Sequence, residues 1–344
     1  MNRQRVLGPP YRTVLKPYGH ALVALARQRH EIVCLTGDLT RQCEIDLFQA
    51  EFPDRFVHAG MAEANMIGVA GALARQGLMP WVHSFGVFVT RRPLDQIVNA
   101  VAYPGLPVRL VGFMPGISSP GGPSHQAIED AALMRAIPNM TVVDVADATE
   151  TAQAVRAIAD LPGPVYLRLK RGEIPVIFPD DHHFSLESAQ VLAVPEGGER
   201  SDVALLASGM MVAPALAAAT TLRAHGVAAT VVNVPVIKPL DTATVLSVAG
   251  ASQVVITAEN HSVIGGLGSA VAEALAESGL GRPLRRTGLR DTFAEGAKDA
   301  HYLFTKYGLT VQNLVTTAWS ALDRPGTPPS PPPLEVAADE YAPV

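Results

Sequence analysis

The chain has 344 residues, of which 48% are hydrophobic and 17% charged, and its formal net charge is −5. This length exceeds what one hydrophobic core usually serves, so we expect a globular protein of two domains. The negative charge offers no basic footprint for nucleic acid, and no apolar run is long enough to span a membrane. The N-terminal segment lacks the apolar core of a signal peptide. The two cysteines, Cys34 and Cys43, indicate neither a disulfide framework nor a zinc site, so we expect a cytoplasmic protein.

The first half of the chain alternates between strand and helix patterns. Short apolar runs predict buried strands at residues 31–39, 108–114, 140–146 and 163–172. Apolar residues at helical spacing, each run closed by a glycine, predict helices at 63–77 and 148–163. Strands separated by helices of this length indicate a mainly parallel sheet covered on both faces. We place this first domain at residues 12–178.

The second half repeats the alternation on a smaller scale. Residues 179–200 are rich in Pro, Gly and charge and are predicted to be a linker, and residues 201–322 form the second domain. Its strands are predicted at 202–209, 228–237 and 253–260, and its helices at 211–225, 241–249 and 265–279. The proline-rich residues 323–344 are predicted to be a disordered tail. The fold class is therefore α/β, with two domains that each hold a mainly parallel sheet flanked by helices.

Glu63 stands at the head of a predicted helix among small and apolar residues, and the next charged residue is Arg75. One interpretation is a surface acid in the first turn of a helix, where the helix dipole favours it. The other is a functional carboxylate, because an acid buried without a partner costs several kcal/mol and needs a reason to be there. The local sequence leaves both open.

Two further segments hold candidate site residues. Phe85 and Phe88 lie three residues apart in "PWVHSFGVFVTRR", either as core residues or as a stacking wall for a flat heterocycle. His125 lies in the Gly/Pro/Ser-rich loop "PGISSPGGPSHQAIED", near the start of the helix that follows. It is either a surface or capping residue or an acid, base or hydrogen-bond donor.

Two other patterns resemble known motifs but are interpreted as structural. The glycines of "IGGLGSAVAEAL" do not follow directly on a strand, as a dinucleotide-binding fingerprint requires. The "DDHH" at residues 180–183 is predicted to be a solvated linker loop rather than a set of metal ligands.

Taken together, the motifs resemble the transketolase family, thiamine-diphosphate enzymes that transfer two-carbon ketol units, and more narrowly the C-terminal half of transketolase. The acid motif of that family is matched by "FVHAGMAEANM", its aromatic pocket by "SFGVF", and its substrate loop by "GGPSHQAIED" followed by "RAIPNMTVV". The segments "ENHSVIGGLGSAVAE" and "YGLT" also fit. The resemblance covers residues 12–320 and implies a pyrimidine-binding domain followed by a transketolase C-terminal domain.

The resemblance assigns roles to these residues. In this family the acid donates a proton or a strong hydrogen bond to N1′ of the cofactor's aminopyrimidine ring, which needs a carboxyl group in a dry site. Glu63 would be this catalytic acid, with Phe85 and Phe88 as walls of the pyrimidine pocket. The resemblance also implies that Asp38 and Leu39, after the first predicted strand, face the cofactor.

The same resemblance places two residues on the substrate. His125 matches the family's histidine near the reacting carbonyl and the substrate hydroxyl, and we treat it as both catalytic and substrate-binding. Arg171, in "LRLKRG", matches a contact to the substrate's phosphate group.

The diphosphate site is missing from this sequence. Enzymes of this type hold Mg²⁺ and the diphosphate with a Gly-Asp-Gly…Asn motif, and the only Gly-Asp here is in "TGDLT", without the second Gly. We therefore expect the B subunit of a split transketolase, which binds no metal itself. A separate N-terminal subunit that carries Gly-Asp-Gly would hold Mg²⁺ and the diphosphate. Because such sites form between subunits, the resemblance implies an α₂β₂ tetramer around a homodimeric core.

The substrate side departs from the family pattern. Gly121 replaces an Asp that reads a hydroxyl configuration, and Phe113 or Met114 replaces a His. Leu15 and Gln42 replace an Arg and a Ser that hold the acceptor phosphate in typical members. We therefore expect a small sugar substrate other than the conventional pentose phosphates.

Two alternatives remain open at this point. The beta subunit of a 2-oxo acid dehydrogenase has the same two-domain layout and also supplies the acid, although "HQAIED…RAIPNM" favours transketolase. A non-catalytic regulatory homologue would tolerate Gly121 and the lost phosphate contacts, although the retained Glu63 argues against it.

Overall fold

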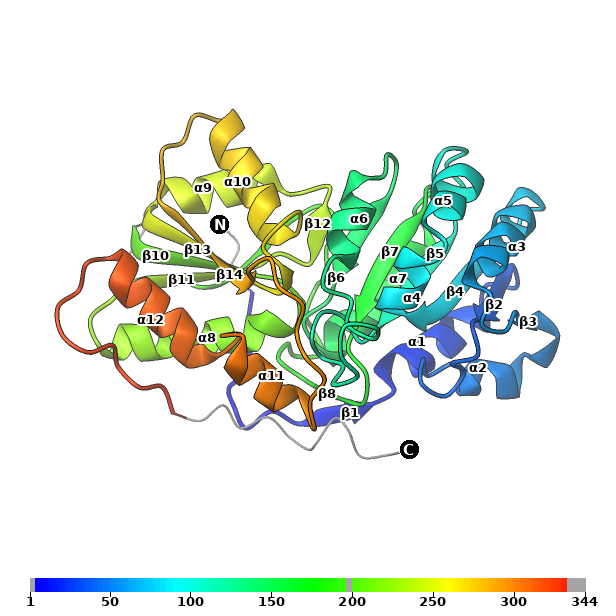
Figure 1. The fold of residues 1–344 in the computed structure, drawn as a ribbon, viewed down its shortest axis with the longest axis horizontal. Coiled ribbons are helices and arrows are strands. Elements are labelled where there is room, and N and C mark those ends of the chain that lie inside the picture. The colour runs from blue at the N-terminus through cyan, green and yellow to red at the C-terminus, as the bar shows by residue number, and fades with distance from the viewer. Residues whose placement is uncertain (1–3, 196–199, 333–344) are drawn as a thin grey trace.

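Two open sheets, one from each half of the chain, lie side by side with helices packed against both faces (Figure 1). The computed structural model describes residues 4–195 and 200–332. Each sheet is mainly parallel, so the predicted α/β class and the pair of helix-flanked sheets are confirmed. In the described part of the chain, no helix combines the length and the apolarity that crossing a membrane requires.

The N-terminal sheet has seven strands in the order β12-β6-β7-β5-β4-β2-β3, and only the β12–β6 pair is antiparallel. Its strands are β2 (Ile32–Thr36), β3 (Phe56–His58), β4 (Met79–Phe85), β5 (Arg109–Phe113), β6 (Thr141–Asp144), β7 (Val165–Leu169) and β12 (Val236–Lys238). One face packs on α1 (Pro17–Ala26) and α7 (Ala148–Ala159). The other packs on α3 (Glu63–Arg75), α6 (Asp130–Ala136) and a π-helix at Ile97–Ala102. Shorter helices connect them: α2 (Asp46–Glu51), a 3₁₀ turn at Pro53–Arg55, α4 (Gly86–Arg91) and α5 (Leu94–Gln96).

The C-terminal sheet has five strands in the order β14-β13-β10-β11-β9, and only β9 runs antiparallel. Its strands are β9 (Gln190–Ala193), β10 (Ser201–Ala207), β11 (Ala229–Asn233), β13 (Ser252–Ser262) and β14 (Leu284–Leu289). One face packs on α8 (Val212–Ala224), preceded by a 3₁₀ turn at Gly209–Met211, and α12 (Val311–Ala321), and the other on α9 (Thr242–Gly250) and α10 (Leu267–Glu277). Beside the sheets lie α11 (Ala300–Lys306) and a small antiparallel ribbon of β1 (Thr13–Leu15) and β8 (Glu173–Pro175).

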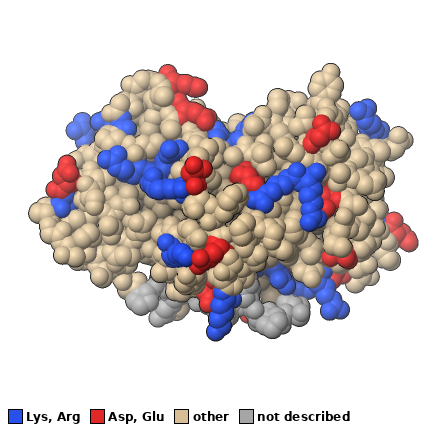
Figure 2. Space-filling model, in the orientation of Figure 1, with Lys and Arg blue, Asp and Glu red and all other residues tan. Residues whose placement is uncertain are grey.

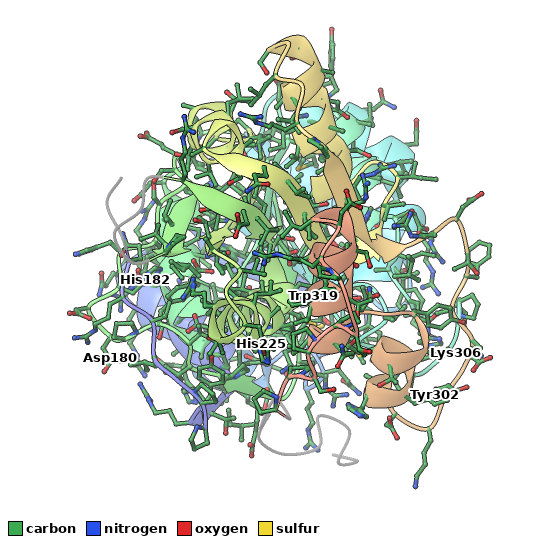
Figure 3. All side chains as sticks on the ribbon, turned by 90° about the vertical axis from the view of Figure 1, so that its left-hand side faces the viewer. Asp180, His182, His225, Tyr302, Lys306 and Trp319 are labelled. Carbon is green, nitrogen blue, oxygen red and sulfur yellow. The ribbon has the colours of Figure 1, made fainter. Side chains whose placement is uncertain are left out.

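Three segments differ from the sequence-based expectations. The strand predicted at 228–237 is broken at Pro235, which has no amide hydrogen for the ladder, and its second part crosses to the N-terminal sheet as β12. The predicted linker at 179–200 contains β9, which pairs with β11 of the C-terminal sheet. Of the predicted tail, Pro325 and Pro329 accept hydrogen bonds from Trp319 (labelled in Figure 3) and Gln312 of α12. Residues 333–344 lie outside the described residues.

The 180–183 segment is partly solvated. Asp180 and Asp181 are exposed and pair with arginines near the N-terminus. His182, labelled with Asp180 in Figure 3, is buried and stacks on Phe178 with ring centroids 4.1 Å apart. The expectation of a solvated loop is therefore wrong for His182. No cluster of three or more His, Cys, Asp or Glu within residues 4–195 and 200–332 could hold a metal ion.

The surface carries no dominant charge on the face shown in Figure 2, where acidic and basic side chains are interspersed. The surface is hollowed between the two lobes. An open groove of about 250 Å³ is lined by residues of α6, β12, α9 and α10. Two of its cations are already engaged, because Arg135 donates to the Gly265 carbonyl and Lys238 to the Ile137 carbonyl.

A buried charge network joins the two sheets at Arg168, at the end of β7. The Arg168 guanidinium donates two hydrogen bonds to Asp130, at 2.9 and 3.1 Å, and one to Asp144, at 2.7 Å. It also donates to the backbone carbonyl of Asn260 in β13, at 3.1 Å, and Ser208 from the C-terminal sheet donates to Asp144. The network thus connects α6, β6 and β7 with the C-terminal sheet.

Burial and charge act in opposite directions on the two acids. At Asp130 burial is the largest single effect and disfavours the ionised form, but the charges of Arg168 and His261 and the hydrogen bonds from Arg168 and Tyr166 together lower the pKa. At Asp144 burial is the larger effect, and its pKa is raised in spite of Arg168. Both carboxylates therefore interact with the Arg168 guanidinium that lies between them.

Replacing Arg168 by Met should destabilise the protein by about 3–5 kcal/mol, because two carboxylates would stay buried without their cation. The matched control is Arg27→Met, which removes an exposed pair with Glu51 and should cause no measurable change. Urea-induced unfolding followed by circular dichroism measures both. Equal midpoints for Arg168→Met and the wild type would show that the network is not required for stability.

Candidate functional site

The predicted site residues gather at the carboxyl edge of the N-terminal sheet, where ligands bind in open α/β sheets. Asp38 and Leu39 follow β2, Phe85 ends β4, and His125 lies in the long loop after β5. Glu63 begins α3, which packs beside these strands. The sequence places these residues far apart, and the sheet order brings their strands together as neighbours.

Glu63 is a buried acid with a partner. Its side chain is 2% exposed, and its Oε1 accepts a hydrogen bond at 2.7 Å from Arg92, whose side chain is 47% exposed. Beside this carboxylate lie Gly37 and Ser84, and a Cβ added to Gly37 would be 3.6 Å from Glu63 Oε1 and from Ser84 Oγ. Ser84 Oγ is buried and has no hydrogen-bond partner among the described residues. The interpretation of Glu63 as a surface acid is therefore wrong.

Phe85 and Phe88 form a stacked pair next to Arg92, the partner of Glu63. Phe85 and Phe88 have ring centroids 5.9 Å apart and planes 25° apart. The Arg92 guanidinium lies 4.1 Å from the centroid of Phe88. His125 meets Phe88 edge-on, at 5.3 Å and 73°, and lies within hydrogen-bonding distance of Ser124. The structure thus brings Glu63, both aromatic rings and His125 into one cluster, with His125 in the turn five residues before α6.

The loop that carries His125 is held by the C-terminal domain. Asn260 of β13 accepts a hydrogen bond from the Ile117 amide and donates one to the Pro115 carbonyl, at 3.0 and 2.9 Å. Gln126 donates to the Glu295 carbonyl at 3.1 Å. Sequence reasoning did not single out Asn260, although it lies in the "ENHSVIGG" segment that carries part of the resemblance.

The other predicted residues lie at the rim. Asp38 adopts a left-handed conformation and is half-exposed, within hydrogen-bonding distance of His58. Leu39 is half-buried and packs on the core beneath α1. Arg171 is half-buried and makes no hydrogen bond or ion pair with another described residue. Their roles toward cofactor and substrate stay predictions.

The substituted positions have structural explanations of their own. Phe113 is fully buried and packs edge-on against Tyr18, and Leu15 is 60% exposed. A Cβ on Gly121 would lie 2.9 Å from the Cβ of His125, closer than real Cβ atoms come. An Asp at this position would therefore require His125 to move. The loop here is built around a residue without a side chain.

The buried pair of His83 and Tyr18 was not predicted from the sequence. Burial lowers the pKa of His83 to about 4, so its ring is neutral at physiological pH. Its Nδ1 is 3.0 Å from the Leu35 carbonyl, which can only accept, and its Nε2 is 2.6 Å from the Tyr18 hydroxyl. The Nδ1–H therefore donates to Leu35, and Tyr18 donates to Nε2. This chain of hydrogen bonds fixes Tyr18, which packs against Phe113.

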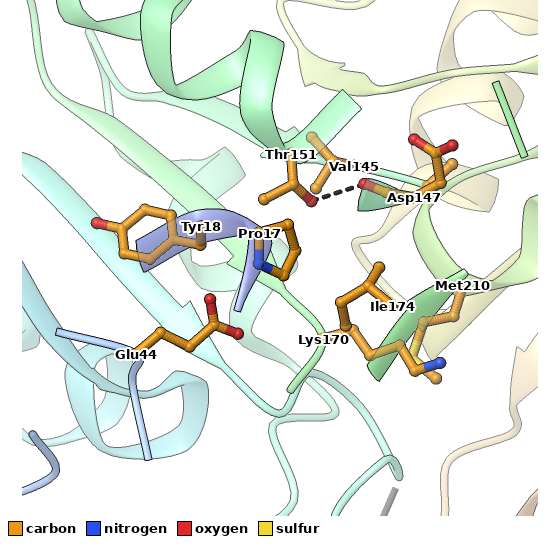
Figure 4. Close-up of a pocket in the computed structure, with 10 residues that line it drawn as sticks. Pro17, Tyr18, Glu44, Val145, Asp147, Thr151, Lys170, Ile174 and Met210 are labelled. Carbon is orange, nitrogen blue, oxygen red and sulfur yellow. Dashed lines mark hydrogen bonds between the residues drawn. The ribbon is translucent and has the colours of Figure 1, made fainter. Parts of the chain in front are cut away.

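A second feature beneath α1 is a small cavity (Figure 4) of about 10 Å³, which is room for one water molecule and not for a substrate. Glu44 lines it in a left-handed conformation and accepts a hydrogen bond from the Gly19 amide at 3.1 Å. Burial raises the pKa of Glu44 to about 7. It is therefore a structural acid that is largely protonated below neutral pH.

Comparisons with known proteins identify the family of both domains. Residues 12–176 match the transketolase pyrimidine binding domain and residues 194–314 the transketolase C-terminal domain. The putative uncharacterized transketolase family protein y4mN of Sinorhizobium fredii is 43% identical over 311 residues, which cover 89% of this chain and 88% of the relative. The 6-deoxy-6-sulfo-D-fructose transketolase subunit SqwH of Clostridium sp. is 44% identical over 309 residues, which cover 89% and 94%.

A solved structure is similar over nearly the whole described chain. It is a split gene transketolase in the form of an inactive β4 tetramer. It superposes with a TM-score of 0.81 at 42% identity and covers 90% of this chain and 97% of that one.

The stability of the Glu44→Gln variant relative to the wild type should increase as the pH rises from 5 to 8. The folded-state pKa of Glu44 lies above its unfolded value, so its contribution to stability is present at low pH and is lost as the pH rises toward 7. Gln keeps an acceptor for Gly19 without a charge. We expect its advantage over the wild type to grow by about 1–3 kcal/mol between pH 5 and pH 8 in thermal unfolding.

The surface variant Asp95→Asn is the control for this experiment and should show no such trend. If the difference between Glu44→Gln and the wild type stays constant over the same pH range, Glu44 does not titrate as described.

Proposed function

Because the chain belongs to the transketolase family, we propose that it is the C-terminal subunit of a thiamine-diphosphate-dependent split transketolase. In this role it takes part in the transfer of a two-carbon ketol unit from a ketose donor to an aldehyde acceptor. The observation that carries the proposal is the buried Glu63 in the first turn of α3, beside a stacked pair of aromatic rings and a histidine. Family membership favours this proposal over a 2-oxo acid dehydrogenase, and the retained acid favours it over a regulatory homologue.

The residues of the cluster fit an aminopyrimidine ring. Glu63 supplies a dry carboxylate for a ring nitrogen, Phe85 and Phe88 a flat apolar wall, and Ser84 an unpartnered buried hydroxyl. When bound, thiamine diphosphate supplies the carbon nucleophile that carries the ketol unit. Glu63 would hold a proton between its carboxyl oxygen and that ring nitrogen, and the aromatic pair would orient the ring and exclude water.

His125 would act on the substrate. It stands at the edge of Phe88, on a loop that the C-terminal domain fixes through Asn260. From this position its imidazole would donate a hydrogen bond to a substrate oxygen and orient the reacting carbonyl. The two domains therefore contribute to the same site, the first through the pocket and the second by holding the loop.

The proposal includes a partner. Among the described residues, as in the sequence, no Gly-Asp-Gly motif is present to hold Mg²⁺ and the diphosphate. We assign that task to a separate N-terminal subunit in an α₂β₂ assembly. The similar split gene transketolase is an inactive tetramer of β chains, which supports the idea that a β chain needs a partner for activity.

The substrate we propose is a sugar with a sulfonate in place of a phosphate. A relative at 44% identity is a 6-deoxy-6-sulfo-D-fructose transketolase subunit. In this chain Leu15, Gln42 and Phe113 replace the phosphate contacts of typical family members. Arg171 has no described ion-pair partner and would bind the sulfonate.

Glu63→Gln in the assembled enzyme should lower kcat by about 10²–10⁴-fold, because Gln keeps the size of the side chain but cannot hold the proton in the same way. Asp95→Asn, at an exposed position of α5, is the matched control and should retain full activity. Circular dichroism checks that both variants fold. A Glu63→Gln enzyme that keeps more than about a tenth of the wild-type kcat would remove Glu63 from the mechanism.

The substrate proposal predicts an order of kcat/KM values. On the assembled enzyme, 6-deoxy-6-sulfofructose should be a better donor than fructose 6-phosphate or xylulose 5-phosphate by about tenfold or more. A phosphate monoester carries about two negative charges at neutral pH and a sulfonate carries one, so the loss of two or three charge-assisted contacts, each worth about 1.5–3 kcal/mol, weakens phosphate binding more. A phosphorylated pair with the highest kcat/KM would contradict this interpretation of the substituted positions.

A further inference from the structure

Arg92 makes two contacts of the kind that the proposed site offers to an aminopyrimidine ring. It donates a hydrogen bond from Nη1 to Oε1 of Glu63 at 2.7 Å, and its guanidinium lies 4.1 Å from the centroid of Phe88. Like an aminopyrimidine, a guanidinium is planar, carries N–H donors and stacks on aromatic faces. It therefore uses the same acid and the same aromatic wall that the proposed site offers to the cofactor.

We propose that Arg92 is a placeholder for the aminopyrimidine in the cofactor-free chain, and that its guanidinium leaves Glu63 when the ring binds. This inference rests on the proposed function. It adds a residue that controls access to the pyrimidine site, and it makes Arg92 a positioning residue for Glu63 rather than a catalytic one.

The burial of Glu63 explains why a placeholder is needed. The carboxylate is 2% exposed, and a buried carboxylate without a partner strongly destabilises the folded state. In the part of the chain that the structure describes, no second cation pairs with Glu63. A subunit that folds before it meets its cofactor therefore requires Arg92, or a proton, to neutralise its acid.

The surroundings of Arg92 explain how it can leave. It follows the last residue of the short helix α4, and its side chain is 47% exposed. The preceding Arg91 is tied down, because it pairs with Glu129 and donates to the carbonyls of Pro123 and Gln126. Among the described residues, the Arg92 side chain makes polar or cation–π contacts with Glu63 and Phe88 alone, so within this part of the chain it can rotate into solvent without breaking other hydrogen bonds.

The placeholder has a thermodynamic consequence. An aminopyrimidine ring can bind Glu63 only in chains whose Arg92 guanidinium has left the carboxylate. The apparent affinity for the cofactor therefore equals the intrinsic affinity multiplied by the fraction of chains in which Arg92 is unpaired. Because Arg92 is half-exposed, its pair is partly screened and the reduction is moderate.

The test is thiamine diphosphate binding to the assembled pair of subunits at fixed Mg²⁺, measured by isothermal titration calorimetry. Arg92→Ala should tighten binding by about threefold to tenfold. Arg92→Lys, which keeps the cation but not the planar face, should lie between Arg92→Ala and the wild type. Arg75→Ala, an exposed arginine on α3, is the control and should not change the affinity. Unchanged or weaker binding by Arg92→Ala would overturn the inference.

A second measurement uses the cofactor-free chain alone. Arg92→Ala should lower the Tm in the wild-type background and lower it less, or not at all, in a Glu63→Gln background. Equal effects in both backgrounds would show that the pair does not exist and would overturn the inference while leaving the proposed function intact. A wild-type assembly that binds no thiamine diphosphate would instead overturn the proposed function, and this inference with it.

Discussion

The geometry of the candidate site depends on one buried cation, Arg168, placed between two carboxylates at the junction of the two sheets. The aspartates come from α6 and β6, and the same guanidinium reaches the backbone of β13. The residue that it reaches there is Asn260, whose side chain holds the loop that carries His125. A shift of one sheet relative to the other would therefore move His125 relative to Phe88 and Glu63. The charge network gives the two domains one arrangement, which a purely apolar contact would specify less strictly.

Four of the buried acids are neutralised in three different ways, and the differences match their roles. Asp130 and Asp144 share a permanent cation that is itself fully buried, which suits a junction that should not move. Glu44 has its pKa raised to about 7 by burial, so protonation can neutralise it and it needs no dedicated partner. Glu63 has a half-exposed arginine that can be removed. Of these three arrangements, the third is the one that, on our proposal, frees a carboxylate for a ligand.

Much of the fold could be predicted from the sequence, because the elements that pack on both faces have strong apolar periodicity. The strands at 31–39 and 163–172 and the helices at 63–77 and 148–163 were predicted close to their observed bounds. The errors lie where tertiary contacts decide. Pro235 sends β12 to the other sheet, and β9 lies in a polar stretch that resembles a linker.

The site was predictable in its residues but not in its charges. Glu63, Phe85, Phe88 and His125 could be named from their resemblance to the family's motifs, and the structure brings them together. Arg92 could not be named, because an ion pair across 29 residues leaves no local pattern.

On the proposed function, this chain supplies only half of an active site. The most direct measurement is ketol transfer with thiamine diphosphate and Mg²⁺, by the purified chain alone and by the chain mixed with the Gly-Asp-Gly-bearing subunit. We expect no turnover by the chain alone and cofactor-dependent turnover by the mixture. Turnover of a ketose by the chain alone would contradict it.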